Sequence, residues 1–245
     1  MMTPQPRGAV KKRGRALVTG GAVRLGRAIA LALAGAGMDV AISYHRSTRA
    51  AQQTLADLRA CGVHAFALRA DLRDPRAAQR LVVEAGRRLD GLDVLVNNAG
   101  VFTRTPFGTV TPAQYDRFLD VNLRAAFFCS QSAAATMRRA GGHIVNVGDV
   151  GAERAWPGYI PYTISKAGIV ALTRGLAVAL RPRRIAVNGV SPGAVLRPPG
   201  FPLARWKALT RGQAGRPEDV AAAVLFFATC PRYITGQVLH VDGGG

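Results

Sequence analysis

Short apolar runs alternate with longer stretches of helical period along most of this chain. The runs are rich in Val, Ile and Leu, as are strands buried on both faces of a parallel sheet. They predict strands at 16–19, 39–43, 64–68, 94–96, 144–147, 185–189 and 238–241. The stretches between them predict helices at 24–36, 48–60, 75–89, 112–139, 159–180 and 217–228. This alternation predicts an α/β fold with helices on both faces of a parallel sheet.

The order of these elements favours a doubly wound, seven-stranded parallel sheet of the Rossmann type. A length of 245 residues suits one such domain better than two smaller ones. Residues 1–14 are basic and contain Pro and Gly, which predicts a flexible tail before a domain spanning 15–245. The Pro- and Gly-rich segment 193–215 predicts a loop over the carboxyl edge of the sheet, where ligands bind in this architecture.

The composition describes a packed globular protein with a basic surface. Apolar residues make up 49% and charged residues 19%, which excludes wholesale disorder. The net charge of +19 comes mostly from arginine, and the arginines are scattered while aromatic residues are only 7%. A nucleic-acid site needs a concentrated basic patch with stacking aromatics, so we expect a solvated basic surface and no nucleic-acid partner. Such a surface can steer anionic ligands towards a cleft.

The cysteines, histidines and apolar runs give further expectations. Cys61, Cys129 and Cys230 are far apart and odd in number, which suits a reducing compartment, so we expect a cytoplasmic protein. No apolar run reaches membrane-spanning length, and we expect no membrane association. The histidines lie in no arrangement with carboxylates or cysteines typical of a metal site, and no metal is expected.

A glycine-containing turn follows the first predicted strand. It begins at Thr19 and Gly20 and reaches Gly26, where a helical pattern has already started. Tight strand-to-helix turns need the backbone freedom of glycine, and the free N–H groups at the start of a helix attract a pyrophosphate. Alone this is a weak signal, because glycine-rich turns also occur in loops that bind nothing.

Further landmarks follow in order, each at a predicted strand end or on a predicted helix. They are Asp71, the segment Asn97-Asn98-Ala99-Gly100, Asn122, the pair Tyr162 and Lys166, and Ser191-Pro192-Gly193. Together they resemble the short-chain dehydrogenase/reductase family from residue 15 to residue 245. The resemblance implies a nicotinamide cofactor and an oligomer, either a homodimer or a homotetramer.

Within that family the chain looks most like the pteridine reductases. Arg24 stands where the middle glycine of the turn is usual, and Asp149 stands thirteen residues before the tyrosine in place of serine. The second strand runs into Tyr44-His45-Arg46-Ser47, with no acidic residue to repel a 2′-phosphate. Phe102 lies where pteridine reductases carry a pterin-stacking aromatic residue, although Gly100 replaces a ligand-contacting serine of some of them. The expected cofactor is therefore NADPH.

Tyr162 and Lys166 lie four residues apart, which puts both on one helix face. A neighbouring ammonium favours tyrosinate, so we expect Lys166 to lower the pKa of Tyr162 and make it a competent proton donor. In isolation an ordinary surface pair is the simpler interpretation, and the other landmarks favour catalysis. The resemblance implies that Lys166 also binds the nicotinamide ribose and that Asn122 supports the site behind it.

Asp149 is expected near Tyr162, at the carboxyl end of the fifth strand. Its carboxylate could relay a proton or bind the amino-pyrimidine edge of a pterin, and partial burial would raise its pKa. The structural alternative is a helix cap. The residues expected to contact substrate are Arg24, Phe102, Asp149, Tyr159 and Tyr162, and Trp156 and Trp206 are weaker candidates because aromatic residues more often belong to the core.

The cofactor contacts follow from the turn, the strand ends and the resemblance. They are Thr19, Gly20, Arg24, Leu25, Gly26, His45, Arg46, Ser47, Asp71, Leu72, Asn98, Ala99, Gly100, Tyr162, Lys166, Pro192 and Gly193. Asp71 and Asn98 could equally be strand-end caps.

The leading hypothesis is an NADPH-dependent reductase that transfers hydride to a pterin or dihydropterin. The alternative is a short-chain carbonyl reductase, such as a 3-oxoacyl thioester reductase, which would use the same Tyr162 and Lys166. A dinucleotide-sensing or nucleic-acid-binding protein on the same fold is the non-enzymatic alternative, because fold alone does not decide function.

Overall fold

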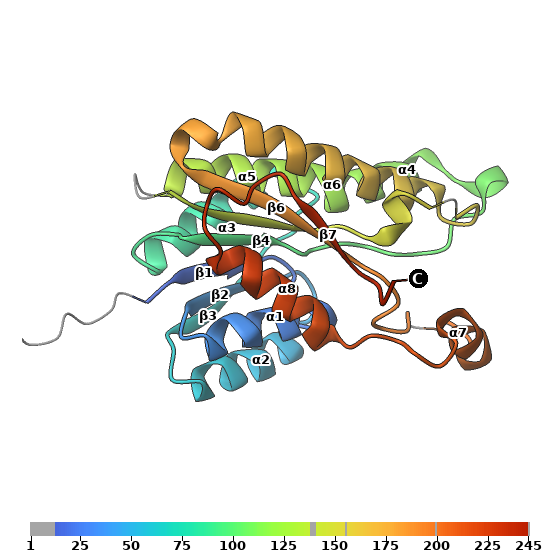
Figure 1. Ribbon diagram of the computed structural model, residues 1–245, viewed down its shortest axis with the longest axis horizontal. Coiled ribbons are helices and arrows are strands. Elements are labelled where there is room, and N and C mark those ends of the chain that lie inside the picture. The colour runs from blue at the N-terminus through green and yellow to red at the C-terminus, as the bar shows by residue number, and fades with distance from the viewer. Residues whose placement is uncertain (1–12, 138–140, 155, 199, 245) are drawn as a thin grey trace, which may run out of the picture.

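Seven strands of mainly buried Val, Ile, Leu and Ala residues form one sheet in the computed structural model, which describes residues 13–137, 141–154, 156–198 and 200–244. Every pair of neighbours is parallel, in the order β3-β2-β1-β4-β5-β6-β7 (Figure 1). The strands are β1 (Arg15–Val18), β2 (Asp39–Tyr44), β3 (Ala65–Arg69), β4 (Val94–Asn97), β5 (Gly142–Val147), β6 (Ile185–Pro192) and β7 (Val238–Val241). The predicted fold class is confirmed.

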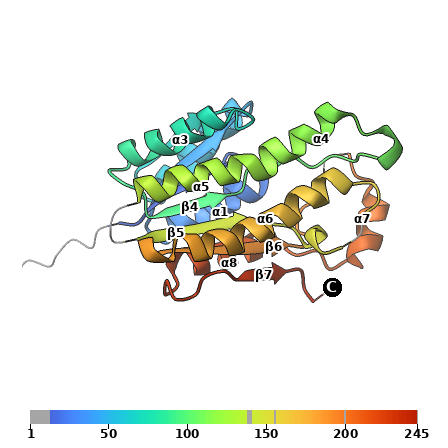
Figure 2. The same cartoon turned by 90° about the horizontal axis from the view of Figure 1, so that it is seen from above.

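Helices cover both faces of the sheet, and each layer buries its own apolar cluster (Figures 1 and 2). One layer contains α1 (Arg24–Gly35), α2 (Thr48–Ala60) and α8 (Pro217–Thr229). The other contains α3 (Pro75–Arg88), α5 (Ala125–Thr136) and α6 (Ile160–Ala179). Two further α-helices, α4 (Pro112–Phe118) and α7 (Leu203–Thr210), lie apart from each other at the same end of the molecule. Among the described helices, none is both long enough and apolar enough to cross a membrane.

The strand order reverses between β1 and β4, and this reversal positions the site. From β1 the chain proceeds outward through β2 to β3, and then returns to the other side of β1 as β4. The connections that leave the ends of β1 and β4 therefore diverge and open a crevice between them. Residues Thr19 and Asn98, which follow these two strands, stand at that crevice.

The structure differs from the expected elements in two places. The helix expected at 112–139 is interrupted by a π-helical turn, η2 (Leu119–Arg124), and residues 138–140 lie outside the described ones. The expected loop 193–215 contains α7, because the eight residues Leu203–Thr210 are mostly good helix formers between Pro- and Gly-rich flanks. Of the predicted tail, residues 1–12 lie outside the described residues, and Arg13 donates to the carbonyl of Gly62.

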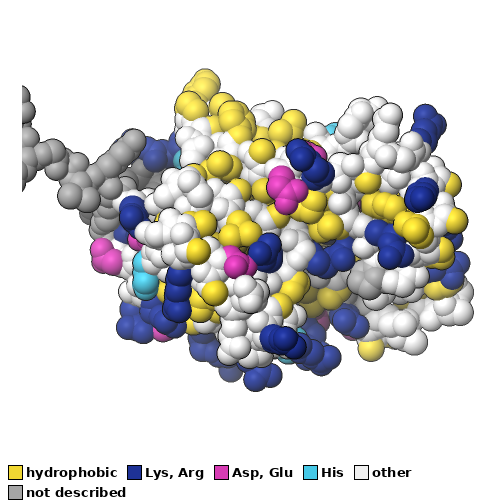
Figure 3. Space-filling model, turned by 90° about the horizontal axis from the view of Figure 1, so that it is seen from below, with side chains coloured by type: hydrophobic (Ala, Val, Ile, Leu, Met, Phe, Trp, Pro, Cys, Tyr) yellow, Lys and Arg dark blue, Asp and Glu magenta, His cyan; other side chains and the backbone are white. Residues whose placement is uncertain are grey.

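The basic side chains are spread widely over the surface. On the face drawn in Figure 3 the Lys and Arg residues stand at many separate places, with polar and apolar atoms between them. Several are paired with carboxylates, including Arg27 with Asp57 at 2.7 Å and Arg87 with Glu84 at 2.7 Å. The distribution matches the scattered arginines of the sequence.

A buried arginine joins the amino-terminal ends of the two central strands. Arg15, at the start of β1, donates from Nε to Asp93 Oδ2 and from Nη2 to Asp93 Oδ1, both at 2.7 Å, and also to the carbonyl of Asp90. Its side chain is 7% exposed, and hydrogen bonding to Asp93 raises its pKa. A guanidinium at this depth must be paired, so Asp93 is required by the fold.

We predict that Asp93→Ala lowers the free energy of unfolding by about 3 kcal/mol or more, because it leaves a buried charge without its partner. Urea unfolding monitored by circular dichroism measures the change. The control is Glu84→Ala, which removes the exposed partner of Arg87 and should lower the free energy of unfolding far less than Asp93→Ala does, because water already screens that ion pair. Equal losses in the two variants would contradict the structural role of Arg15 and Asp93.

Candidate active site

The crevice between β1 and β4 is closed at its base by one threonine. Thr19 Oγ1 accepts hydrogen bonds from the backbone N–H groups of Asn98 and Ala99, each at 3.0 Å. It donates in turn to the carbonyl of Val96 at 3.3 Å. The side-chain amide of Asn98 then donates to the carbonyls of Thr19 at 2.9 Å and Gly20 at 3.2 Å. Thr19 and Asn98 therefore hold the turn in place from beneath.

The turn itself needs glycine and leaves a helix end open. Gly20 has a φ of +63°, and a Cβ on Gly26 would stand 2.2 Å from the carbonyl oxygen of Gly20. Helix α1 then starts without a side-chain cap on Val23 and without an acidic residue in its first turn. Uncapped N–H groups at a helix N-terminus bind anions, so this turn fits the pyrophosphate of a dinucleotide.

Arg24 adopts the conformation of the glycine that it replaces. Its φ is +52°, in the left-handed region that non-glycine residues rarely occupy. Its guanidinium donates to the carbonyls of Leu196 at 3.4 Å and Arg197 at 3.2 Å. It was predicted to contact both cofactor and substrate, and the structure turns its guanidinium towards segment 193–215.

A second group of predicted cofactor contacts, those that follow β2 and β3, lies around the ends of these two strands. His45 Nε2 lies 3.6 Å from Asp71 Oδ2, and Arg46 and Ser47 are exposed beside them. Asp71 accepts hydrogen bonds from Arg73, and those bonds lower the pKa of its carboxyl to about 2. Asp71 is therefore ionised at neutral pH, and Arg73 balances its charge.

The other predicted cofactor contacts differ in what they can offer. The side chains of Leu25 and Leu72 pack against the core, so these residues can face the crevice only through their backbones. Gly100 is exposed beside Asn122. Pro192 is the buried last residue of β6, and a Cβ on Gly193 would stand 2.7 Å from Asp242 Cβ. Close backbone packing explains the glycine at 193.

Tyr162 and Asp149 are joined by a short hydrogen bond. The Tyr162 hydroxyl, on α6, donates to Asp149 Oδ2 at 2.6 Å, and Asp149 Oδ1 accepts from the backbone N–H of Gly151 at 2.7 Å. Lys166, one turn further along α6, donates from Nζ to the carbonyl of Val147 at 2.9 Å. The end of β5 therefore brings Asp149 and the helix pair together, as the sequence predicted. The predicted alternative of a cap is also present, because Asp149 caps the turn η3 (Val150–Ala152).

Asn122 supports this arrangement from the π-helical turn η2. Its side chain accepts from the N–H of Val101 at 2.7 Å, and donates to the carbonyl of Val101 at 3.1 Å and to Ser165 Oγ at 3.0 Å. Ser165 Oγ donates to the carbonyl of Tyr162 at 2.6 Å. Asn122 thus links the segment after β4 to α6, the helix that carries Tyr162 and Lys166, through Ser165.

The pKa of Tyr162 is shifted in the direction opposite to the expected one. Burial, the charge of Asp149 and the hydrogen bond to its carboxylate raise the pKa of Tyr162 well above its usual value. The expectation that Lys166 lowers it was wrong, because burial and then the Asp149 carboxyl at 2.6 Å raise the pKa, while Lys166 Nζ lies 5.8 Å from the Tyr162 ring centroid. Burial also raises the pKa of Asp149, as expected, and lowers that of Lys166.

Several aromatic rings lie around Tyr162, whose hydroxyl is bonded to Asp149. Phe102 stacks on Tyr159 with ring centroids 4.7 Å apart and meets the Tyr162 ring edge-on, also at 4.7 Å. Trp156 lies parallel to Tyr162 at 6.5 Å. Phe102 and Tyr159 therefore lie beside Tyr162 as predicted, and Trp156, a weaker candidate, also lies beside it. Trp206 lies instead against Phe201, at 6.4 Å.

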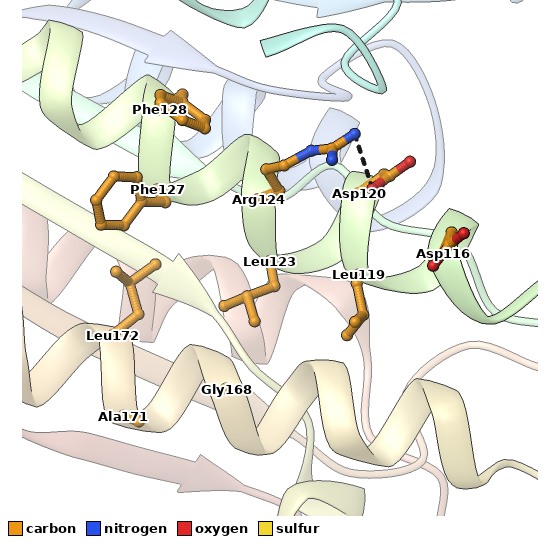
Figure 4. Close-up of a pocket in the computed structure, with 10 residues that line it drawn as sticks. All are labelled: Asp116, Leu119, Asp120, Leu123, Arg124, Phe127, Phe128, Gly168, Ala171 and Leu172. Carbon is orange, nitrogen blue, oxygen red and sulfur yellow. Dashed lines mark ion pairs between the residues drawn. The ribbon is translucent and has the colours of Figure 1, made fainter.

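A hollow of about 630 Å³ lies away from these residues, between η2 and α5 on one side and α6 on the other (Figure 4). Its lining is mostly apolar, and the side chains of Leu119, Leu123 and Leu172 point into the space between the helices. It contains none of the predicted site residues. No group of three or more described His, Cys, Asp or Glu side chains is placed to hold a metal ion.

Known proteins resemble this chain over nearly its whole length. The family model described as enoyl-(acyl carrier protein) reductase matches residues 21–245. A 3-oxoacyl-(acyl-carrier-protein) reductase of Staphylococcus aureus is 35% identical over 96% of this chain and 99% of its own. An L-rhamnose 1-dehydrogenase of Sphingomonas is 36% identical over 93% of this chain and 94% of its own.

Solved structures of other proteins also resemble this chain over nearly its whole length. A short-chain dehydrogenase from Burkholderia cenocepacia, in complex with NADP, has a TM-score of 0.88 and 40% identity over 94% of this chain and 96% of its own. A blue fluorescent protein from a metagenomic library, in complex with NADPH, has a TM-score of 0.88 and 38% identity over 94% of this chain and 97% of its own. The class that fold and site define is thus a nicotinamide-dependent oxidoreductase.

The chain belongs to the short-chain dehydrogenase/reductase family. The predicted family is confirmed, together with oxidoreductase activity as its class. The finer resemblance to pteridine reductases finds less support, because curated relatives named above reduce 3-oxoacyl thioesters or oxidise a sugar. These relatives favour the alternative that the sequence left open.

We predict that Asp149→Ser lowers the pKa of Tyr162, because it removes the carboxylate whose charge and hydrogen bond raise it. The pKa should stay above the ordinary value of about 10, since burial of the phenol remains. Ultraviolet titration of tyrosinate absorbance measures the shift, and subtraction of the matching Tyr162→Phe titration identifies the signal. An unchanged or higher Tyr162 pKa in Asp149→Ser would contradict the assigned cause.

Proposed function

We propose that the protein is an NADPH-dependent reductase of a small-molecule carbonyl compound, with Tyr162 as the proton donor. The observation that carries this proposal is the buried Tyr162 hydroxyl, 2.6 Å from Asp149 at the carboxyl edge of the sheet and on the same helix as Lys166. Membership of an oxidoreductase family supports it. The ordered pair and its partner carboxylate argue against a binding protein that has lost its chemistry.

The cofactor is NADPH. Solved relatives hold NADP or NADPH, and segment 45–47 offers Arg46 with no acidic residue beside it. The open N-terminus of α1 and the Gly20 turn would hold the pyrophosphate. When bound, the nicotinamide supplies the hydride.

The protein would supply the proton from Tyr162. Its raised pKa keeps the phenol protonated at neutral pH, so the proton is available to a substrate oxygen that displaces Asp149. Asp149 has a raised pKa and can hold a proton and return it to Tyr162. Lys166 is fixed by the Val147 carbonyl and would offset the negative charge that Tyr162 carries after giving up its proton.

A 3-oxoacyl thioester is the substrate class that we favour. Reductases acting on such thioesters match this chain at 35% and 34% identity, over 96% and 94% of its length. Their chemistry needs one hydride and one proton across a ketone, and here the nicotinamide would supply the hydride and Tyr162 the proton.

A pterin or dihydropterin is the second candidate, and two observations favour it. Asp149 stands where a serine would be enough to polarise a ketone, and its carboxylate could accept hydrogen bonds from an amino-substituted ring. Phe102 and Tyr159 present stacked aromatic rings beside Tyr162. A flat bicycle gains about 0.5 to 1.5 kcal/mol from stacking on such a face.

Self-association remains our prediction, as a homodimer or homotetramer. The groove between α5 and α6 (Figure 4) is lined mainly by apolar side chains, and Phe127 at its edge is 43% exposed. Burying such a surface against another copy would stabilise an oligomer.

We predict that Tyr162→Phe lowers kcat by about 10² to 10⁴ while NADPH binding is largely kept, because the ring still packs and the transferable proton is gone. Stopped-flow measurement of NADPH oxidation gives the rate, and NADPH fluorescence titration gives the affinity. Thr163→Val, on the same helix turn, is the control and should keep its rate. A Tyr162→Phe enzyme with the parent rate would exclude Tyr162 as the donor.

The substrate class is tested by NADPH oxidation with a short 3-oxoacyl thioester against dihydrobiopterin, each at several concentrations. We expect the thioester to have the higher kcat/KM. Asp149→Ser should shift the ratio further towards the thioester, because it removes the carboxylate that would select an amino-substituted ring. A higher kcat/KM for dihydrobiopterin in the parent protein would overturn the thioester assignment and establish the second candidate.

A further inference from the structure

We propose that Arg69 is a further determinant of cofactor choice, and that its guanidinium binds the 2′-phosphate of NADPH. The proposal rests on the proposed cofactor and adds a residue outside the segment that follows β2. No motif of the sequence pointed to Arg69, because it is the last residue of a different strand.

The sheet register places Arg69 beside the expected ribose segment. Arg69 is the last residue of β3 and pairs with Tyr44, the last residue of β2, and the N–H of Ala70 donates to the Tyr44 carbonyl at 2.9 Å. The chain leaves β2 directly into His45, Arg46 and Ser47. Arg69 therefore lies alongside the start of the segment that is expected to meet the ribose.

One edge of the Arg69 guanidinium is anchored to this segment. Nε donates to the carbonyl of His45 at 3.2 Å. Among the described residues, Nη1 and Nη2 of Arg69 have no carboxylate partner, since no ion pair in that part of the chain includes this residue. Those two nitrogens present the forked donor geometry that matches the oxygens of a phosphate.

Anchoring also distinguishes Arg69 from Arg46. Arg46 is exposed and makes no side-chain hydrogen bond or ion pair within the described chain, so binding a phosphate would cost it most of its rotamer freedom. Arg69 is already held through Nε. A pre-oriented donor loses less entropy on binding, so Arg69 is the better placed of the two arginines to select a phosphate.

The charges around Arg69 do not oppose an anion. It lines a hollow of about 510 Å³ together with His45, Asp71, Asp74 and Arg80, among others. Asp71 is paired with Arg73, Asp74 with Arg80 at 3.3 Å, and Glu84, which also lines the hollow, with Arg87 at 2.7 Å. With these carboxylates compensated, Arg69 and the exposed Arg46 give the ribose segment a positive local field that favours an added phosphate.

Calorimetric binding of adenosine 2′,5′-bisphosphate against adenosine 5′-monophosphate tests the proposal without substrate or turnover. In Arg69→Gln, which keeps a donor but removes the charge, we expect affinity for the bisphosphate to fall about tenfold or more and affinity for the monophosphate to be unchanged. The loss should shrink at high salt, because the site is exposed. Arg59→Gln is the matched control. Its Nε likewise donates to a backbone carbonyl, that of Ala65 at 3.2 Å, at the opposite end of β3, and it should change either affinity less than about twofold.

The outcomes separate the alternatives. Equal losses for both ligands in Arg69→Gln would make Arg69 a structural clasp for His45 and overturn the proposal, and so would no loss for either ligand. If the parent protein itself fails to prefer the bisphosphate, the proposed cofactor is wrong and the role of Arg69 falls with it. Arg69→Lys keeps the charge without the fork, and an intermediate loss there supports bidentate binding. Thermal unfolding of each variant confirms that it folds.

Discussion

The hydrogen bonds of Thr19 hold together the two strand ends on which the whole site depends. In a doubly wound sheet the chain departs from β1 and β4 in opposite directions, so the segments that follow these two paired strands diverge. Thr19 joins them by accepting from the N–H groups of Asn98 and Ala99, and Asn98 returns its amide to the carbonyls of Thr19 and Gly20. The Thr19 hydroxyl and the Asn98 side-chain amide are therefore both engaged in hydrogen bonds within the protein. The crevice therefore keeps its width and leaves the N-terminus of α1 open for a ligand.

A second constraint is electrostatic and concerns three ionisable groups buried at one edge. Asp149, Tyr162 and Lys166 cannot all be charged there without loss of stability, because burial penalises each charged form. The pKa values of the three groups reflect this penalty. Those of Asp149 and Tyr162 rise, and that of Lys166 falls, each with burial as its first cause. For Asp149 the folded-state pKa exceeds the unfolded one, so its contribution to stability is fully present below the unfolded pKa. That contribution is lost as the pH rises through the folded pKa. The site thus gives up stability at neutral pH to keep a buried carboxyl group beside a phenol.

The fold was predictable because its signals are periodic and local. Apolar runs located every strand, and the glycine turn, Asp71, Tyr162 and Lys166 fell at strand ends or on helices where topology brings them together. What could not be predicted depends on contacts across the chain. Arg24 meets carbonyls at positions 196 and 197, Lys166 meets the Val147 carbonyl, and burial together with Asp149 raises the pKa of Tyr162. Helix α7 was missed because its Pro- and Gly-rich flanks dominated the local pattern, and no local signal marks the π-helical turn that carries Asn122.

Arg24 joins the two halves of the site. A left-handed conformation costs a residue with a Cβ about 1 to 2 kcal/mol relative to glycine, so the chain retains this residue against its backbone preference. The guanidinium reaches Leu196 and Arg197, at the start of the segment that leads to α7. Those partners are neutral carbonyls, and an anion on the phosphate turn would compete for the same donors with a charge-assisted hydrogen bond. An anion that draws Arg24 away must release the carbonyls. By linkage, anything that holds segment 193–215 against Arg24 weakens binding of that anion to the same extent.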